Sequence, residues 1–520
     1  MKEKITERMK KRRIWLDGGF GTMLQQRGLG PGETTESWNL SHPEDVTAVH
    51  RAYLNAGCDV INANTFGINS LKYENYQELL RAGLRCAQEA CRDFPECYIA
   101  LDVGPTGRLL EPLGDLSFDR AVSAFADLFR ALPELAAEGL CPDLILIETM
   151  NDAYETKAAV LAAKEHSDLP IFVTNVYDES GKLMTGADPE AMIAMLEGLG
   201  VSALGMNCSL GPDKMLPLMD IFSRRASVPV IAKPNAGLPE VRDGKTVFAM
   251  NQDDFAGYSE QLARKGASIL GGCCGSTPDY LREVIARTKE IPLPVLSDKN
   301  ITVVSSYSHA VTVDRSPVLI GERINPTGKP KLKEALRAGD MSYILGEGIR
   351  QADSGAHILD VNVGLPEIDE AAVMKKVIQE LQAVTDLPLQ IDTSDPAALE
   401  GAMRVYNGKP LVNSVNGNED SMRQVFPLVK KYGGTVIALT LDENGIPETA
   451  EGRVAIARRI IDRAAEYGIL AKDIIVDPLA LTVSSDSESA NITLATIKEL
   501  TRLGIKTSLG VSNISFGLPQ

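Results

Sequence analysis

The sequence predicts an α/β protein made of two consecutive (β/α)8 TIM barrels, the second apparently truncated after its seventh strand. Three observations predict this fold. A chain of 520 residues is too long for one hydrophobic core, so two or more domains are expected. Short apolar runs alternate with stretches of helical spacing, which is typical of β/α units around a parallel sheet. Nearly every run ends in a polar or metal-binding residue, as in barrels whose chemistry lies at the carboxyl ends of the strands.

Residues 1–290 contain eight such runs and are predicted to form one complete barrel. The runs are 14–17, 60–64, 98–102, 144–148, 171–175, 203–207, 230–235 and 269–273. Residues 291–317 are rich in proline, serine and charge, so we expect a linker there.

Residues 318–520 contain seven further runs and are predicted to form the second barrel. These runs are 318–322, 358–362, 389–392, 411–413, 436–440, 474–477 and 508–513. Because the chain stops at Gln520, we expect this barrel to lack its last helix–strand–helix portion. Its first and seventh strands would then keep unpaired edges, which should make it the less stable half.

Composition excludes several classes of partner. A formal charge of −17 disfavours nucleic acid and anionic membranes, because both need clustered lysine and arginine. No apolar run is long enough to span a bilayer, and no apolar stretch follows the basic first thirteen residues as in a secretory signal. We therefore expect a cytoplasmic protein with a solvated first helix, whose partners are small molecules or other proteins.

Three cysteines indicate a zinc site. Cys208 ends one apolar run, and Cys273 and Cys274 end another. Three thiolates with an open fourth position are typical of catalytic zinc, and the two runs are too far apart for a zinc finger. The alternative is that Cys273 and Cys274 are small buried residues in a glycine-rich turn. The other five cysteines have no ligand-like pairing and are predicted to be packing residues.

Motifs at the strand ends identify a family for each barrel. The first barrel contains DGGFGT at 17–22, NTFG at 64–67, GMNC at 205–208 and GGCCG at 271–275. With these motifs it resembles the homocysteine-binding module of zinc-dependent methyltransferases. The second contains GERIN at 321–325, LDVN at 359–362, IDT at 391–393, VNS at 412–414, DP at 477–478 and GVSN at 510–513. It resembles the pterin-binding methyltransferase module. In this order the two resemble the N-terminal half of the cobalamin-dependent methionine synthase family, over essentially the whole chain.

The resemblance implies roles for residues of the first barrel. The three cysteines would bind zinc, which holds the homocysteine sulfur as a thiolate at neutral pH. Asp17 and Glu148 would hold the amino-acid end of homocysteine, although Asp17 could instead be a helix N-cap. Asn235 would lend its side-chain oxygen to zinc before the substrate arrives, although a turn asparagine is equally consistent with the sequence.

In the second barrel the resemblance implies a site for methyltetrahydrofolate. The matching strand-end positions are Glu322, Asp360, Asp392, Asn413, Asp477 and Asn513. Asp392, Asn413 and Asp477 would face the pterin edge, whose adjacent N–H groups a carboxylate can accept. Asn513 would face N5, the atom that carries the methyl group.

The predicted function is a methyl shuttle. Methyltetrahydrofolate would methylate cob(I)alamin at the second barrel, and methylcobalamin would then methylate homocysteine at the first. The chain has no Asp-x-His-x-x-Gly motif, so the corrinoid is expected on another module or subunit.

Two alternative functions stay open. One is a homocysteine S-methyltransferase that uses another donor, such as a betaine or S-methylmethionine, with a corrinoid partner. The other is a non-catalytic zinc- and folate-binding scaffold.

Overall fold

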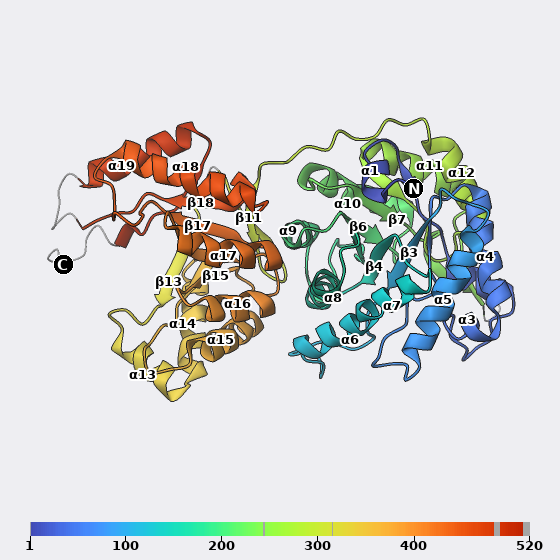
Figure 1. Cartoon of the computed structure of the whole chain (residues 1–520), viewed down its shortest axis with the longest axis horizontal. Coiled ribbons are helices and arrows are strands. Elements are labelled where there is room, and N and C mark those ends of the chain that lie inside the picture. Colours follow the sequence, from blue (N-terminus) through green and yellow to red (C-terminus); the bar gives the residue numbers. More distant parts are fainter. Residues whose placement is uncertain (1, 243–244, 315, 483–488, 513–520) are drawn as a thin grey trace. The chain divides into compact units, whose positions relative to one another are not determined.

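The computed structural model describes residues 2–242, 245–314, 316–482 and 489–512 (Figure 1). The chain divides into two compact units. Unit 1 consists of Met1–Glu197 and Val201–Lys299, and unit 2 consists mainly of Asn300–Gln520. In the described part of the chain, no helix is both long enough and apolar enough to cross a membrane.

Unit 1 is a closed barrel of eight parallel strands. The sheet order is β1-β10-β7-β6-β5-β4-β3-β2, and a bridge between Leu16 and Val60 joins its two ends. The strands are β1 (Ile14–Trp15), β2 (Val60–Asn62), β3 (Tyr98–Val103), β4 (Leu144–Met150), β5 (Ile171–Asn175), β6 (Ala203–Asn207), β7 (Val230–Lys233) and β10 (Ala267–Leu270). All eight coincide with predicted runs, so the fold predicted for this half of the chain is confirmed.

Except for α1, which precedes the first strand, the helices of unit 1 follow the strands in the chain and cover the outside of the barrel (Figure 1). They are α1 (Ile5–Arg8), α2 (Phe20–Gln26), α3 (Trp38–Ser41), α4 (Pro43–Ala56), α5 (Tyr76–Cys91), α6 (Phe118–Arg130), α7 (Leu132–Ala137), α8 (Ala153–His166), α9 (Pro189–Leu199), α10 (Pro212–Arg225), α11 (Gln252–Lys265) and α12 (Pro278–Thr288). An antiparallel hairpin of β8 (Pro239–Arg242) and β9 (Lys245–Phe248) lies between β7 and α11.

The first helix closes the amino-terminal end of the unit 1 barrel. Ile5 and Met9 are buried in one cluster with residues near the amino ends of the strands, among them Ile14, Val60 and Leu144. Burying an isoleucine side chain stabilises a fold by about 1.5–3 kcal/mol. The expectation of a solvated first helix is therefore wrong on its apolar face. Lys10 and Lys11, just after the helix, are exposed and pair with Glu7 and Glu3. The carboxyl ends of the strands remain available for a site.

Unit 2 is a sheet of seven parallel strands in chain order. The strands are β13 (Ile320–Ile324), β14 (Ile358–Val361), β15 (Leu389–Asp392), β16 (Leu411–Asn416), β17 (Thr435–Leu439), β18 (Ile474–Asp477) and β19 (Lys506–Thr507). The seven-stranded second barrel is thus confirmed, and no described residues of β13 and β19 pair with each other. The helices are α13 (Pro330–Ala338), α14 (Met341–Asp353), α15 (Glu370–Val384), α16 (Pro396–Val405), α17 (Glu419–Tyr432), α18 (Ala450–Glu466) and α19 (Ser489–Arg502), with a 3-10 turn at Ala471–Asp473.

The seventh strand begins earlier than predicted. The sequence predicts a strand over 508–513, whereas β19 is Lys506–Thr507 and pairs with Ile475 and Val476 of β18. Because β18 ends at Asp477, the ladder cannot extend far beyond Ser508, whose amide donates to the Val476 carbonyl. Gly510 and Val511 therefore belong to the loop after the strand.

The predicted linker contains a β-hairpin. Strands β11 (Thr302–Ser305) and β12 (Ala310–Val313) pair antiparallel. Val304 of β11 is buried against Ile358, Leu411 and Ile437, which lie at or near the amino ends of unit 2 strands. The segment before the first strand therefore plugs this barrel as α1 plugs the first. A short alternating run such as Thr302–Ser305 is only a weak sequence signal of a buried strand, because its burial depends on the barrel strands against which it packs.

Two of the cysteines predicted to be packing residues form a disulfide. Cys91 ends α5, Cys97 precedes β3, and their Cα atoms lie 6.2 Å apart. The prediction is wrong for this pair because the intervening turn folds back on itself. The amide of Phe94 donates to the Cys91 carbonyl, and that of Cys97 donates to the Phe94 carbonyl. The remaining six cysteines are free thiols.

Candidate functional site

Three thiols converge at the carboxyl ends of β6 and β10. The sulfur atoms of Cys208, Cys273 and Cys274, hereafter the thiol cluster, all lie within 4.8 Å of one another. Cys208 directly follows β6 with a left-handed φ of 58°, which turns its side chain out of the strand direction. A Cβ at Gly272 would lie 2.0 Å from the Ser276 hydroxyl, so only glycine permits the tight turn before Cys273.

Asn235 lies against this cluster. Its Oδ1 accepts a hydrogen bond from the Cys274 amide at 3.1 Å, and its side chain also bonds the Cys208 thiol. The backbone is fixed as well, since the Cys273 amide donates to the Pro234 carbonyl at 2.8 Å. The structure thus brings Asn235 beside the thiols. Its predicted role as a zinc ligand stays a prediction.

Electrostatics explain why the thiol cluster suits a cation. Hydrogen bonds from the other two thiols lower the pKa of Cys208 to about 3. Bonding to Cys208 raises the pKa of Cys274 to about 11 and also raises the pKa of Cys273 well above its ordinary value. Without a cation only one thiol therefore ionises readily, because three thiolates this close would repel one another. A soft divalent metal would relieve that repulsion and match a set of three sulfur ligands.

A group of buried charges, hereafter the buried charge cluster, occupies the same end of the barrel. It consists of Asp17, Asp102, Glu148 and Lys233, none of them more than 7% exposed. Lys233 forms an ion pair with Glu148. Burial favours the neutral form of this lysine, but the charges of Glu148, Asp17 and Asp102 together outweigh burial and raise its pKa. Three acids thus share one lysine.

Two of these acids keep an unused oxygen. Asp17 accepts from the Asn62 amide at 2.8 Å through Oδ2, while its Oδ1 and that of Asp102 have no partner among the described residues. Burial raises the pKa of Asp17 to about 7, and burial with the nearby Glu148 charge raises that of Asp102. A bound ammonium group would satisfy these oxygens and favour their ionised forms.

The sequence predicts roles for Asp17 and Glu148 but not for Asp102, Lys233 or Asn207. Asp102 ends the run 98–102, so the strand-end signal that selects Asp17 also applies to it. Lys233 lies inside the run 230–235, where a lysine between apolar residues is a signal of a buried ion pair. Asn207 precedes Cys208 and contacts Cys273, which no local pattern could show.

In unit 2 the predicted residues gather at the carboxyl ends of β14, β15 and β16. Asp360 accepts from Gln390 at 2.6 Å and from Asn413, while Asp392 accepts from Asn362 at 3.0 Å. Burial and the neighbouring Asp392 charge raise the pKa of Asp360 to about 7. A polar cavity of about 390 Å³ opens beside Asp392 and Asn413. The arrangement can accept N–H donors from a flat polar ring.

The last predicted strand ends lie around β18 and β13. Burial raises the pKa of Asp477 to about 6, and its Oδ1 accepts from the Leu479 amide at 2.7 Å. The buried Arg453 side chain fixes this loop by donating to the carbonyls of Pro478 and Leu479. Glu322 accepts from the Ser512 hydroxyl at 2.9 Å. Asn513 lies outside the described residues, so its role stays a prediction.

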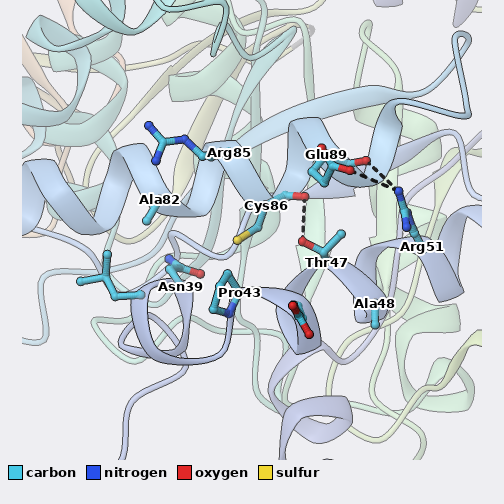
Figure 2. Close-up of a pocket in the computed structure, with 11 residues that line it drawn as sticks. Asn39, Pro43, Thr47, Ala48, Arg51, Ala82, Arg85, Cys86 and Glu89 are labelled. Atoms are coloured by element: carbon cyan, nitrogen blue, oxygen red, sulfur yellow. Dashed lines mark hydrogen bonds and ion pairs between the residues drawn. The ribbon is translucent and has the colours of Figure 1, made fainter.

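A separate cavity of about 610 Å³ lies between α4 and α5 on the outside of unit 1. Figure 2 shows Thr47 donating to the Cys86 carbonyl at 3.5 Å and Arg51 facing Glu89 across it, with Arg51 and Glu89 3.5 Å apart. No member of the thiol cluster or the buried charge cluster lines it. The candidate site is therefore at the strand ends and not in this outer cavity.

Comparison with known proteins identifies the family. The sequence model for homocysteine S-methyltransferase matches residues 14–288, which is more than half of the chain. This chain belongs to the homocysteine S-methyltransferase family. The model for pterin-binding enzymes matches residues 321–519 of the same chain. The chain is therefore a methyltransferase-family enzyme with a pterin-binding domain, as the motifs predict.

Curated relatives carry both regions. The chain is 32% identical over 538 residues to the methionine synthase of Mycobacterium tuberculosis, covering 96% of this chain and 45% of that protein. It is 31% identical over 544 residues to the methionine synthase of Mycobacterium leprae, covering 96% of this chain and 44% of that protein. This methyltransferase-family chain thus spans less than half the length of these relatives.

Solved structures match parts of the chain. The metallated homocysteine methyltransferase MmuM of Escherichia coli is 23% identical, with a TM-score of 0.44, and covers 54% of this chain and 98% of its own. A dihydropteroate synthase of Xanthomonas albilineans in complex with 7,8-dihydropteroate is 23% identical, with a TM-score of 0.33, and covers 41% of this chain and 77% of its own.

Proposed function

We propose that the chain contains two methyl-transfer sites that act in succession. In unit 1 the site would hold the homocysteine sulfur as a thiolate that accepts a methyl group through a new C–S bond. In unit 2 the site would hold methyltetrahydrofolate so that N5 keeps the electron pair of its broken N–C bond and takes a proton as the methyl group leaves. A corrinoid would carry the methyl group between the two sites, accepting it from N5 and giving it to sulfur.

The observation that carries this proposal is the position of the thiol cluster beside the buried charge cluster. Homocysteine has a thiol at one end and an ammonium group at the other. The thiol cluster would bind zinc, which holds the substrate sulfur as a thiolate at neutral pH. The unpartnered oxygens of Asp17 and Asp102, with Glu148, would accept the ammonium group. One barrel end thus offers a complement to both ends of the substrate.

The second site rests on its hydrogen-bond acceptors. Asp392, Asn413 and Asp477 would hold the pterin edge, with Asp360 and Glu322 beside them. The raised pKa values of Asp360 and Asp477 are consistent with carboxyls that meet ring N–H groups in a partly dry pocket. Asn513 would face N5 and stabilise the proton that arrives as the methyl group leaves.

The corrinoid would come from another module or protein. None of the five histidines of this chain lies in the Asp-x-His-x-x-Gly pattern of a corrinoid ligand.

The three cysteines of the proposed zinc site must stay reduced to bind metal. That requirement favours a cytoplasmic location, where thiols are kept reduced, whereas the Cys91–Cys97 disulfide is of a kind more common in oxidising compartments.

Methyl transfer by the chain itself tests the proposal. Homocysteine and free methylcobalamin should give methionine, detected by mass spectrometry. A zinc chelator should abolish the reaction, and added zinc should restore it. Methyltetrahydrofolate should convert chemically reduced cob(I)alamin to methylcobalamin, followed by absorbance. Methionine formed from a betaine or S-methylmethionine but not from methylcobalamin would favour a homocysteine S-methyltransferase that uses another donor. Binding of zinc and folate without transfer from any donor would instead indicate a scaffold.

A further inference from the structure

Asn207 connects the two ends of the unit 1 site. It is the last residue of β6 and is completely buried. Its Oδ1 accepts from the Thr149 amide at 2.9 Å, and its Nδ2 donates to the Thr149 hydroxyl at 2.7 Å. The same Nδ2 also donates to the Cys273 sulfur at 3.9 Å. One side-chain amide therefore contacts the residue after Glu148 and a member of the thiol cluster.

The contact with Thr149 holds an unfavourable backbone conformation. Thr149 has a φ of 61°, and a β-branched residue rarely adopts the left-handed region. The pairing of β4 with β5 shifts register between Ile147 and Met150, so Glu148 and Thr149 form a bulge. Bulges re-aim side chains at active sites. Because Asn207 bonds both the amide and the hydroxyl of Thr149, it holds the bulge that directs Glu148 towards Lys233.

The contact with Cys273 acts on the metal-binding end. A hydrogen bond to a thiolate sulfur withdraws electron density from it and fixes its direction, so it tunes a metal ligand from outside the coordination sphere. Asn207 is a neutral amide, and both of its polar ends have partners within the site. It can therefore serve this role without changing protonation state.

We propose that Asn207 is a positioning residue that couples recognition of the homocysteine amino-acid end to the donor strength of the Cys273 sulfur. The inference rests on the proposed zinc and homocysteine site. By its first contact Asn207 keeps the Glu148 bulge in place, and by its second it orients Cys273. Loss of the side chain should disturb both ends at once, which a residue that only fills space would not do.

Cobalt substitution separates the two contacts. With Co²⁺ in place of zinc, the sulfur-to-metal charge-transfer band reports on the thiolates. Asn207→Ala should move this band to lower energy, weaken zinc binding by about 10–100-fold and raise the KM for homocysteine. Asn207→Asp can still accept from the Thr149 amide and hydroxyl but cannot donate to sulfur. It should shift the band while raising KM less than Asn207→Ala does. Thr149→Val should raise KM and leave the band in place.

Asn175 provides a matched control. It is also a completely buried asparagine at the end of a strand, but its amide donates to the Met150 carbonyl and the Thr156 hydroxyl. Asn175→Ala should keep the parent cobalt spectrum and zinc affinity. A parent-like cobalt band in both Asn207 variants, or an equal shift in Asn175→Ala, would overturn the inference. A parent protein that binds no metal or does not methylate homocysteine would instead overturn the proposed function.

Discussion

Replacing Asp17 by asparagine should stabilise unit 1 at neutral and alkaline pH. Burial raises the pKa of this carboxyl from an ordinary 3.8 to about 7. The native state therefore binds the proton more tightly than the unfolded chain, and stability falls as pH rises from about 4 to about 7. With these values the carboxylate lowers the free energy of unfolding by about 2 kcal/mol near pH 5 and about 4 kcal/mol near pH 8. An asparagine avoids this cost and can still accept from the Asn62 amide.

Tryptophan fluorescence offers a direct assay. The only two tryptophans of the chain, Trp15 and Trp38, both lie in unit 1, so urea unfolding followed by their emission reports on that unit. The advantage of Asp17→Asn over the parent protein should grow by about 2–3 kcal/mol between pH 5 and pH 8. Asp45→Asn, a substitution at a half-exposed helical site that loses an ion pair with Arg27, should give no gain in stability over the parent. Asp17→Asn should also bind homocysteine weakly, because it no longer offers a carboxylate to the ammonium group.

Two results would refute this reasoning. If the stability difference between Asp17→Asn and the parent were the same at pH 5 and pH 8, ionisation of Asp17 would not destabilise the fold. If Asp17→Asn were less stable than the parent at pH 8, Lys233 would stabilise the carboxylate by more than burial costs it. Either result would mean that the native pKa of Asp17 lies near or below its ordinary value.

Two further predictions concern the separate sites. Alanine at any one position of the thiol cluster should abolish both stoichiometric zinc binding, measured by metal analysis, and methionine formation, measured by mass spectrometry. The control Cys86→Ala should retain both. Full zinc occupancy in two of the three variants would contradict the assignment of the zinc ligands. Asp392→Ala and Asp477→Ala should weaken methyltetrahydrofolate binding, measured by calorimetry, while leaving methylcobalamin-to-homocysteine transfer intact. Loss of both activities in either variant would argue against independent sites.

The sequence predicts the strands well because each barrel strand is a short apolar run. The polar residue that ends each run lies at the carboxyl edge of the sheet, where the strand ends meet. Asp17 and the thiol cluster are found in this way. Lys233 and Asn207 are not, because their roles depend on partners far away in the chain. Lys233 meets Glu148 and Asn207 meets Thr149 only when β4, β6 and β7 close into a barrel. No local periodicity contains that information.

The charges of the unit 1 site link binding to folding. Three buried acids share one lysine, and three thiols lie within 4.8 Å of one another, so the site without ligands has more potential anions than cations to neutralise them. Such a site resists full ionisation, which is why burial raises the pKa of Asp17 and bonding between the thiols raises that of Cys274. A divalent metal at one end and an ammonium group at the other would each remove part of this imbalance. Ligands that bind only the folded state also stabilise it by mass action. The charge imbalance that disfavours full ionisation of these residues would therefore also favour the proposed substrate, which carries a thiol and an ammonium group.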